Sequence, residues 1–196
     1  MKAKAILINA LKRGREDRDI GLKITSPNDI LSLGHIKKAD HNLVVMTDLK
    51  ELEHGDWVVI AAYYAMYQSS LSLLLKIGLT SREHAATVSV LEYFFGEEIG
   101  KELLEKFNSL KEKKEKLEAL TIQEKYIDYL WEIKRARENV QYGVNTNYKE
   151  TENIMNNARE FVSKIKLVLN ELNEEIIKSI SLEIKKLEKS INGNKL

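Results

Sequence analysis

Cysteine is absent from this chain, and proline and glycine are scarce: its 196 residues contain no Cys, one Pro and nine Gly. Without cysteine the protein can form neither a disulfide nor a thiolate metal site. Proline and glycine interrupt helices, whereas the abundant Ile, Leu, Lys and Glu are compatible with helices. The composition therefore predicts an all-α protein.

An excess of charge of one sign is also lacking. The chain has 31 basic and 30 acidic residues, which gives a formal net charge of +1. Such a balance produces no overall field that would attract nucleic acid or an anionic membrane, so any nucleic-acid site must be a local patch. The apolar run in the opening stretch MKAKAILINALKRG is too short for a secretory signal or a membrane span. We therefore expect a cytoplasmic protein with no membrane partner.

Sequence signatures of metal and cofactor chemistry are missing as well. His35, His41 and His54 lie close together in the sequence, but their spacings do not place them on one helical face. There is no glycine-rich phosphate loop, no GxSxG motif and no paired-carboxylate arrangement that stands out from the charged residues. We therefore expect no metal and no cofactor.

Three parts are expected along the chain. The only proline lies in the turn-like stretch SPND, Ser26–Asp29, which places a boundary near residues 21 to 36. Residues 1–34 are interpreted as an N-terminal extension, residues 35–170 as a helical bundle, and residues 171–196 as an extension of the C-terminal helix. The N-terminal extension should hold one short amphipathic helix and behave as an appendage.

Within the bundle, the spacing of apolar residues predicts a series of amphipathic helices. The first is expected to begin at His35 and to end at the EHGD stretch, residues 53–56. The segment DWVVIAAYYAMYQSSLSLLLKIG, which ends at Gly78, is broadly apolar and should be the central, most buried helix. Ser81 is the expected N-cap of the next helix.

The second half of the chain is more charged. Residues 97–120 carry only a narrow apolar stripe and are interpreted as a protruding arm. Thr121 is expected to cap the next helix, which runs to about Gly143. From Ile154 to Ile191 apolar residues recur at gaps of three or four, which predicts a single long helix with a seam like that of a coiled coil.

The length of this seam predicts a partner. Beyond Leu172 the apolar positions continue further than one compact bundle could cover, and an exposed stripe of that length usually finds a partner. A second copy of the chain in a two-fold dimer is the expected partner.

One arginine, Arg137, lies on the apolar stripe of the helix that precedes Gly143. Burying an unpaired guanidinium is costly, so Arg137 should either pair with a carboxylate, such as that of Glu92, or face a polar cleft. The residues alone leave both interpretations open. The stripe comprises Tyr126, Leu130, Ile133, Val140 and Val144.

Two stretches resemble a known family. The run AAYYAMYQSSLSLLLKIGLTSREHAATVSVLEYFF is similar to the central helix pair of the HEPN family (higher eukaryotes and prokaryotes nucleotide-binding domain). RARENVQYG, followed by ENIMNNAREFVSKI, resembles the family's arginine-bearing helix and closing helix. The resemblance implies an antiparallel helical bundle that dimerises. It also implies RNA-directed activity, since many members are metal-independent ribonuclease toxins encoded beside a small nucleotidyltransferase.

The resemblance also points to site residues. The family's active motif is an arginine, four to six intervening residues and a histidine; Arg137 matches the arginine, but Tyr142 occupies the histidine position of the four-residue version. Tyrosine has a reference pKa of about 10 and is a poor base at neutral pH, although it can still donate a hydrogen bond or stack on a nucleobase. Both are named as tentative catalytic residues. The tentative binding residues are Arg135, Glu138, Asn139 and His84.

These residues predict binding rather than catalysis. The first interpretation is a HEPN-like dimer with a degenerate motif that binds nucleotide or RNA, with a minimal nucleotidyltransferase as a possible partner. Two alternatives stay open. One is an active metal-independent endoribonuclease toxin in which Tyr142 or His84 assists, and the other is a structural interaction protein that uses its terminal helix.

Overall fold

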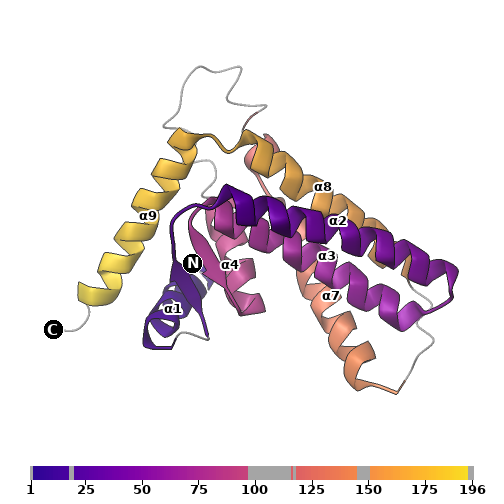
Figure 1. The fold of residues 1–196 in the computed structure, drawn as a ribbon. Coiled ribbons are helices and arrows are strands. Elements are labelled where there is room, and N and C mark those ends of the chain that lie inside the picture. The colour runs from indigo at the N-terminus through magenta and orange to yellow at the C-terminus, as the bar shows by residue number, and fades with distance from the viewer. Residues whose placement is uncertain (1, 18–19, 97–115, 117, 145–150, 194–196) are drawn as a thin grey trace.

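The computed structural model describes residues 2–17, 20–96, 116, 118–144 and 151–193. Within these residues the chain forms seven helices and one small antiparallel sheet of two strands (Figure 1). The predicted all-α class is therefore confirmed. The elements are α1 (Lys2–Glu16), β1 (Leu22–Ile24), α2 (Asp29–Glu51), α3 (Gly55–Lys76), β2 (Leu79–Ser81), α4 (His84–Phe95), α7 (Glu124–Tyr142), α8 (Thr151–Glu171) and α9 (Glu174–Gly193).

Helix α3 is the central helix of the bundle, as its broadly apolar sequence predicts. It packs against α2, α7 and α8. Small residues such as Ala62 and Ala65 are fully buried on it, and the Ser72 hydroxyl donates to the Ser32 carbonyl of α2 at 2.8 Å. Among the described helices, α3 alone is long and apolar enough to cross a membrane, but 78% of its most apolar window is buried inside the fold. That burial is typical of a core helix.

The antiparallel hairpin of α2 and α3 begins earlier than expected. Asn28 caps α2, because its side chain accepts a hydrogen bond from the Leu31 amide at 2.9 Å. The helix therefore starts at Asp29 rather than His35. It ends at Glu51, and the break before α3 falls at residues 52–54, so only the first half of the EHGD stretch lies outside a helix.

Two expected helix caps are wrong, for one physical reason. Ser81 pairs with Leu22 in the β1–β2 sheet, so its backbone is extended and α4 begins only at His84. The Ile122 amide donates to the Phe95 carbonyl, which keeps the backbone next to Thr121 out of the helix, and α7 begins at Glu124. Tertiary hydrogen bonds override the local capping signal in both places.

The first 34 residues are more tightly integrated than an appendage would be. Leu7, Ala10 and Leu11 of α1 are buried in the same apolar core as the bundle, and α1 packs on α4. The chain folds back sharply after α1: a Cβ on Gly14 would lie 1.9 Å from the Leu22 carbonyl oxygen, so only glycine fits there.

The predicted single C-terminal helix is wrong, because the chain breaks between α8 and α9. The Asn173 side chain accepts from the Ile176 amide at 3.0 Å and caps α9, which turns away at the end of α8 (Figure 1). Helix α9 then packs on α1, and the Tyr93 hydroxyl of α4 donates to Glu183 at 3.1 Å.

This break changes what covers the apolar seam. Ile191, at the end of the seam, is partly buried against the main core. Five other seam residues from Leu172 onward are at most 7% exposed within one chain and belong to that core. The seam therefore gives no reason for a dimer, and that premise of the dimer prediction is corrected. These residues are Leu172, Ile176, Ile180, Ile184 and Leu187. The expected arm at residues 97–120 lies almost entirely outside the described residues.

Candidate functional site

Arg137 lies where α7 packs on α3, and an aromatic ring supports it rather than a carboxylate. Its guanidinium carbon is 4.8 Å from the centre of the Tyr63 ring, which is a cation–π distance. The buried Nε has no hydrogen-bond partner, and the side chain as a whole is half-buried. Glu92, the ion-pair partner considered from the sequence, is instead exposed on α4.

Four aromatic side chains from three helices surround this contact, and we call Tyr63, Tyr67, His84 and Trp131 the aromatic cluster. The rings of Tyr63 and Tyr67 are stacked with centres 5.7 Å apart, one helical turn from each other on α3. The His84 ring stacks 5.8 Å from Tyr63 and meets Trp131 edge-on at 5.2 Å. The cluster fixes the position of Tyr63 and, through it, that of Arg137.

His84 is a neutral, buried member of this cluster. Burial, with the Lys134 ammonium adding to its effect, lowers the pKa of His84 from 6.5 to about 4. Both ring nitrogens are buried, and an interaction with the Leu130 backbone partly opposes the lowering of the pKa. A general base must reach the proton that it removes, so this imidazole is not placed for catalysis on a bound substrate.

The tyrosines of the cluster are held as neutral phenols. Burial raises the pKa of Tyr63 to about 12, and the neighbouring Tyr67 adds to the shift while the Arg137 guanidinium opposes it. Burial likewise raises the pKa of Tyr67. At neutral pH these groups can donate hydrogen bonds, but they are not bases.

Tyr142 does not join Arg137. Five residues along an α-helix turn through about 140° relative to the starting side chain, so the two project from different flanks of α7. Tyr142 is the last residue of that helix and is 77% exposed. The spacing that would form the family motif in sequence does not bring the two side chains together.

The remaining predicted residues divide between two faces of α7. Arg135 and Asn139 each lie two positions from Arg137, which places them on the opposite, exposed face. Glu138 accepts from Lys134 at 2.6 Å; this hydrogen bond is the main reason that its pKa is lowered, and the Arg137 charge contributes. The neighbourhood of Arg137 therefore includes Glu138 and His84 from the predicted set.

Three residues of this site were not predicted from the sequence: Tyr63, Lys134 and Trp131. Signals for them existed, because Lys134 precedes Arg137 by three positions and Tyr63 begins an i, i+4 pair of tyrosines with Tyr67. Which face of α3 meets α7 could not be read from either helix separately.

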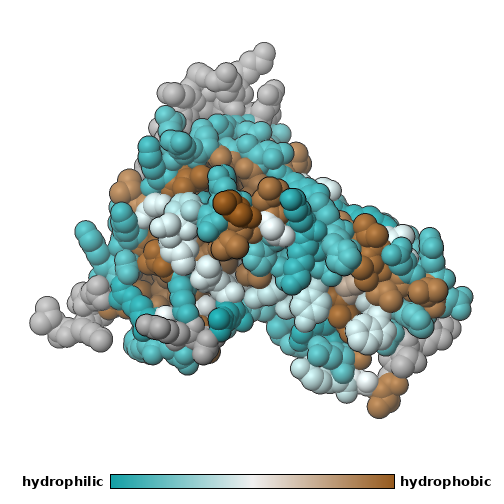
Figure 2. Space-filling view, viewed as in Figure 1, coloured by the Kyte–Doolittle hydropathy of each residue, from teal (hydrophilic) through white to brown (hydrophobic). Residues whose placement is uncertain are grey.

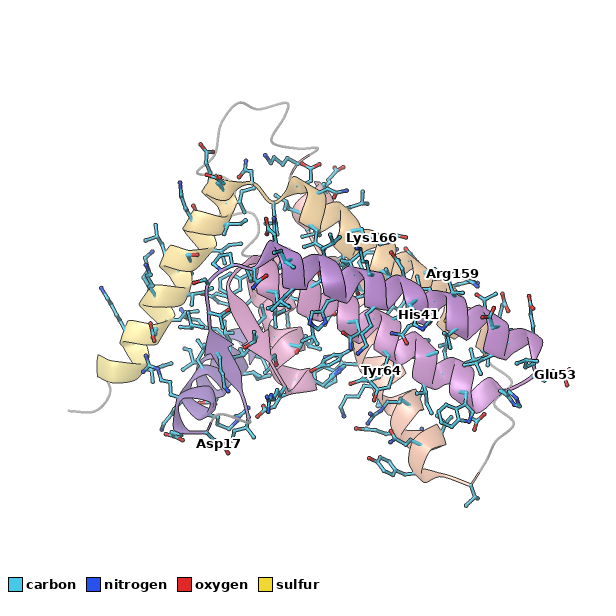
Figure 3. The ribbon with its side chains drawn as sticks, viewed as in Figure 1. Asp17, His41, Glu53, Tyr64, Arg159 and Lys166 are labelled. Atoms are coloured by element: carbon cyan, nitrogen blue, oxygen red, sulfur yellow. The ribbon has the colours of Figure 1, made fainter. Side chains whose placement is uncertain are left out.

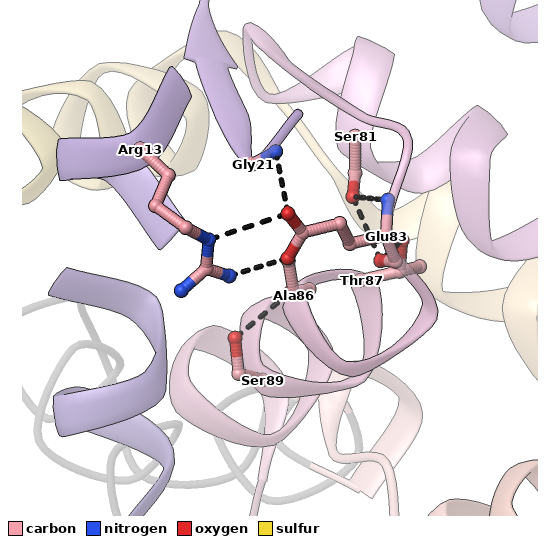
Figure 4. A network of polar contacts seen from close by, with 7 residues as sticks. All are labelled: Arg13, Gly21, Ser81, Glu83, Ala86, Thr87 and Ser89. Atoms are coloured by element: carbon pink, nitrogen blue, oxygen red, sulfur yellow. Dashed lines mark hydrogen bonds and ion pairs between the residues drawn. The ribbon is translucent and has the colours of Figure 1, made fainter. Parts of the chain in front are cut away.

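A polar network positions the helix that carries His84. Glu83, directly before α4, pairs with Arg13 of α1 and accepts from the Gly21 amide at 2.9 Å (Figure 4). Arg13 lowers the pKa of the Glu83 carboxyl, which is therefore ionised at neutral pH. Through this network the N-terminal residues fix the start of α4.

Comparison with known proteins agrees with the architecture. The family model described as HEPN domain matches residues 33–171, which include α7 with Arg137 and α3 with the tyrosines of the aromatic cluster. No curated protein matches the sequence. Among the described residues, no three His, Asp or Glu side chains gather as metal ligands would. Since the match spans most of the chain, the protein belongs to the HEPN domain family.

Proposed function

We propose that the protein binds RNA or a nucleotide through phosphate, with Arg137 as the anion-binding residue. Membership of the HEPN family indicates a function related to nucleotides or RNA. The observation that carries the proposal is the free guanidinium on the Tyr63 ring. Arginine in a protein core usually pairs with a carboxylate, and here no such pair forms within the part of the chain that the structure describes.

The geometry suits an oxyanion. A guanidinium presents its terminal N–H groups as a planar fork that can bind two phosphate oxygens at once. Because the guanidinium of Arg137 already lies over the Tyr63 ring, less side-chain entropy is lost on binding than for a freely rotating arginine. Tyr64, which is 41% exposed with its ring 5.3 Å from that of Tyr63, offers a face on which a nucleobase could stack.

Binding is favoured over cleavage. RNA cleavage without a metal needs a group near the phosphate that accepts the 2′-hydroxyl proton at neutral pH. The buried nitrogens of His84 and the position of Tyr142 on another flank of α7 offer no such group beside Arg137. The degenerate Arg-x4-Tyr motif is therefore proposed to act in recognition rather than as an endoribonuclease.

A second copy of the chain is proposed to pack against Trp57, near the start of α3, and to leave the Tyr64 ring open to a nucleobase. Trp57 is 56% exposed and lies seven residues before Tyr64, so the two share one face of α3 (Figure 3 labels Tyr64). The dimerisation common in the family supports a pairing that would bring two copies of Arg137 near one another. A minimal nucleotidyltransferase is the proposed protein partner, on the strength of the family resemblance.

Two arginines on α7 make a matched test of the proposal. Labelled single-stranded RNA would be titrated with wild type, Arg137→Ala and Arg135→Ala in chelator, and binding followed by fluorescence anisotropy. We expect Arg137→Ala to weaken binding about ten-fold or more, because it removes a charge-assisted phosphate contact. The slope of log affinity against log salt concentration should also fall by about one, as expected for the loss of one phosphate contact. Arg135→Ala removes the same charge from the opposite face and should have a small effect.

The control decides between a site and a general charge effect. Equal weakening by the two variants would mean that only net charge matters, and no weakening by Arg137→Ala would contradict the proposal. Gel analysis of the same RNA after incubation with wild type tests the catalytic alternative. Cleavage in chelator that Tyr142→Phe abolishes would show that the tyrosine is catalytic.

A further inference from the structure

A groove separate from Arg137 lies between α3, α7 and α8. Its volume is about 440 Å³, within the range of small-molecule sites. Figure 1 shows α7 and α8 diverging toward the end of the bundle where α7 finishes and α8 begins. The groove is lined by Met66, Tyr129, Glu132, Ile133, Ala136, Asn153, Ile154 and Asn157.

The groove combines an apolar lining with unpaired polar side chains. Met66 and Ile133 are buried core residues at its base, and the partly exposed Tyr129, Ala136 and Ile154 provide the apolar surface that a ligand can contact. Three polar side chains of the lining make no hydrogen bond or ion pair with any described residue: Glu132, Asn153 and Asn157. By contrast, Lys134 and Arg159, two positions away from Glu132 and Asn157, each form a hydrogen bond within the chain. The carboxylate comes from α7, and the two amides lie four residues apart on α8. All three groups therefore line the same space.

The charge of these groups indicates which class of ligand the groove can bind. The only charged group among the lining residues is the Glu132 carboxylate, so a phosphate would be repelled. A carboxylate accepts two parallel hydrogen bonds, and each asparagine amide can donate and accept. A flat apolar ring whose edge carries two adjacent N–H donors beside a carbonyl satisfies all of these groups.

We propose that this groove binds a purine nucleoside of the guanosine type. The ring lies on the apolar surface of Tyr129, Ala136 and Ile154. Its ring N–H and exocyclic amine donate to Glu132, and its carbonyl accepts from an asparagine amide. Adenine fits less well, because beside its amine it presents a ring nitrogen whose lone pair would face the carboxylate. The site goes beyond phosphate binding at Arg137 and does not depend on it.

Guanosine, which has no phosphate, is the probe for this groove. Binding to the full chain would be measured by calorimetry at neutral pH, with adenosine titrated in parallel. We expect saturable binding of guanosine and clearly weaker binding of adenosine. Glu132→Gln should weaken guanosine binding about ten-fold, since it removes the charge from two hydrogen bonds while preserving the shape of the side chain.

Asp128→Asn is the matched control. It makes the same change of charge and size one turn earlier on α7, at an exposed position outside the groove. This variant should bind guanosine as wild type does. Because Glu132 is also exposed, neither substitution should alter the fold, and thermal unfolding of both variants would verify this.

Three results would overturn the inference: no saturable guanosine binding, equal binding of adenosine, or no difference between Glu132→Gln and Asp128→Asn. An RNA with one unpaired guanine that competes with guanosine would identify the ligand as a base of RNA, and failure to compete would identify a free nucleoside. If guanosine does not bind while Arg137→Ala still weakens RNA binding, only the groove is refuted and phosphate binding stands.

Discussion

At the scale of single residues, Arg137 and His84 both contact the Tyr63 ring, but their chemistry differs. The guanidinium keeps its charge because arginine does not lose its proton in proteins. The imidazole has lost its charge because it is buried beside the Lys134 ammonium, with Arg137 and Glu138 also near it. Tyr63 and Tyr67 on its other side are neutral phenols.

His84 should make the stability of the protein depend on pH. Its folded pKa of about 4 lies below its ordinary value of 6.5, so between these values the unfolded chain binds more protons. The stability is complete above pH 6.5 and declines as the pH falls toward 4, by at most about 3 kcal/mol at about 1.4 kcal/mol per pKa unit.

Urea unfolding at pH 6.8 and pH 5 would measure this dependence. His84→Phe keeps a ring in the cluster but cannot take up a proton, so its stability should fall less than that of wild type over this interval. The carboxyls of Glu83, Glu138 and Glu160 have lowered pKa values and titrate mainly below it. Identical changes in wild type and variant would refute the assignment to His84.

At the scale of elements, one carboxylate adds a polar link between the N-terminal helix and the bundle, beside the apolar contacts that α1 makes with the core. Glu83 joins α1 through Arg13 and the turn before β1 through the Gly21 amide. It also precedes α4, where a negative charge is favourable at a helix N-terminus. A single side chain thus holds three segments together.

Glu83→Ala should therefore destabilise the protein by about 1–2 kcal/mol, less than a buried pair would because both side chains are partly exposed. A double-mutant cycle with Arg13→Ala would be measured by urea unfolding. The double variant should lose less than the sum of the two single variants. Strict additivity would mean that Glu83 acts through the Gly21 amide and the helix terminus instead.

At the scale of the whole molecule, the surface that could pair with a second copy is not the C-terminal seam. Figure 2 shows apolar patches interrupted by charged residues on the face crossed by α2. Exposed apolar side chains on that helix include Ile30 at 85% and Val44 at 59%. On α3, Trp57 and Tyr64 are exposed aromatics, and Tyr64 is the one that touches the ring supporting Arg137.

Light scattering should give the mass of a dimer at micromolar concentration, and Trp57→Lys should shift the protein toward monomer. Burying a lysine in an apolar interface is costly, whereas the same residue on a free surface is tolerated. Leu182→Lys, at a position on α9 that is 60% exposed, is the control and should leave the mass unchanged. A monomeric wild type would refute the dimer.

The helical class, the central helix α3 and the family resemblance were readable from the sequence. These predictions rest on apolar periodicity, the near absence of proline and the YYAMYQSS segment. All three are local properties of the sequence, which do not depend on how distant segments pack. The unusual position of Arg137 on an apolar stripe was readable for the same reason. It identified the residue but could not say what the side chain meets.

Contacts between distant segments decided the rest. The Tyr63 ring under Arg137, the burial of His84 and the capping break at Asn173 each depend on how helices far apart in sequence are packed. Ser81 and Thr121 lost their predicted capping roles because strand pairing and the Phe95 carbonyl hold the backbone extended nearby. A helical pattern specifies which face is apolar, but the tertiary structure alone specifies which partner covers that face.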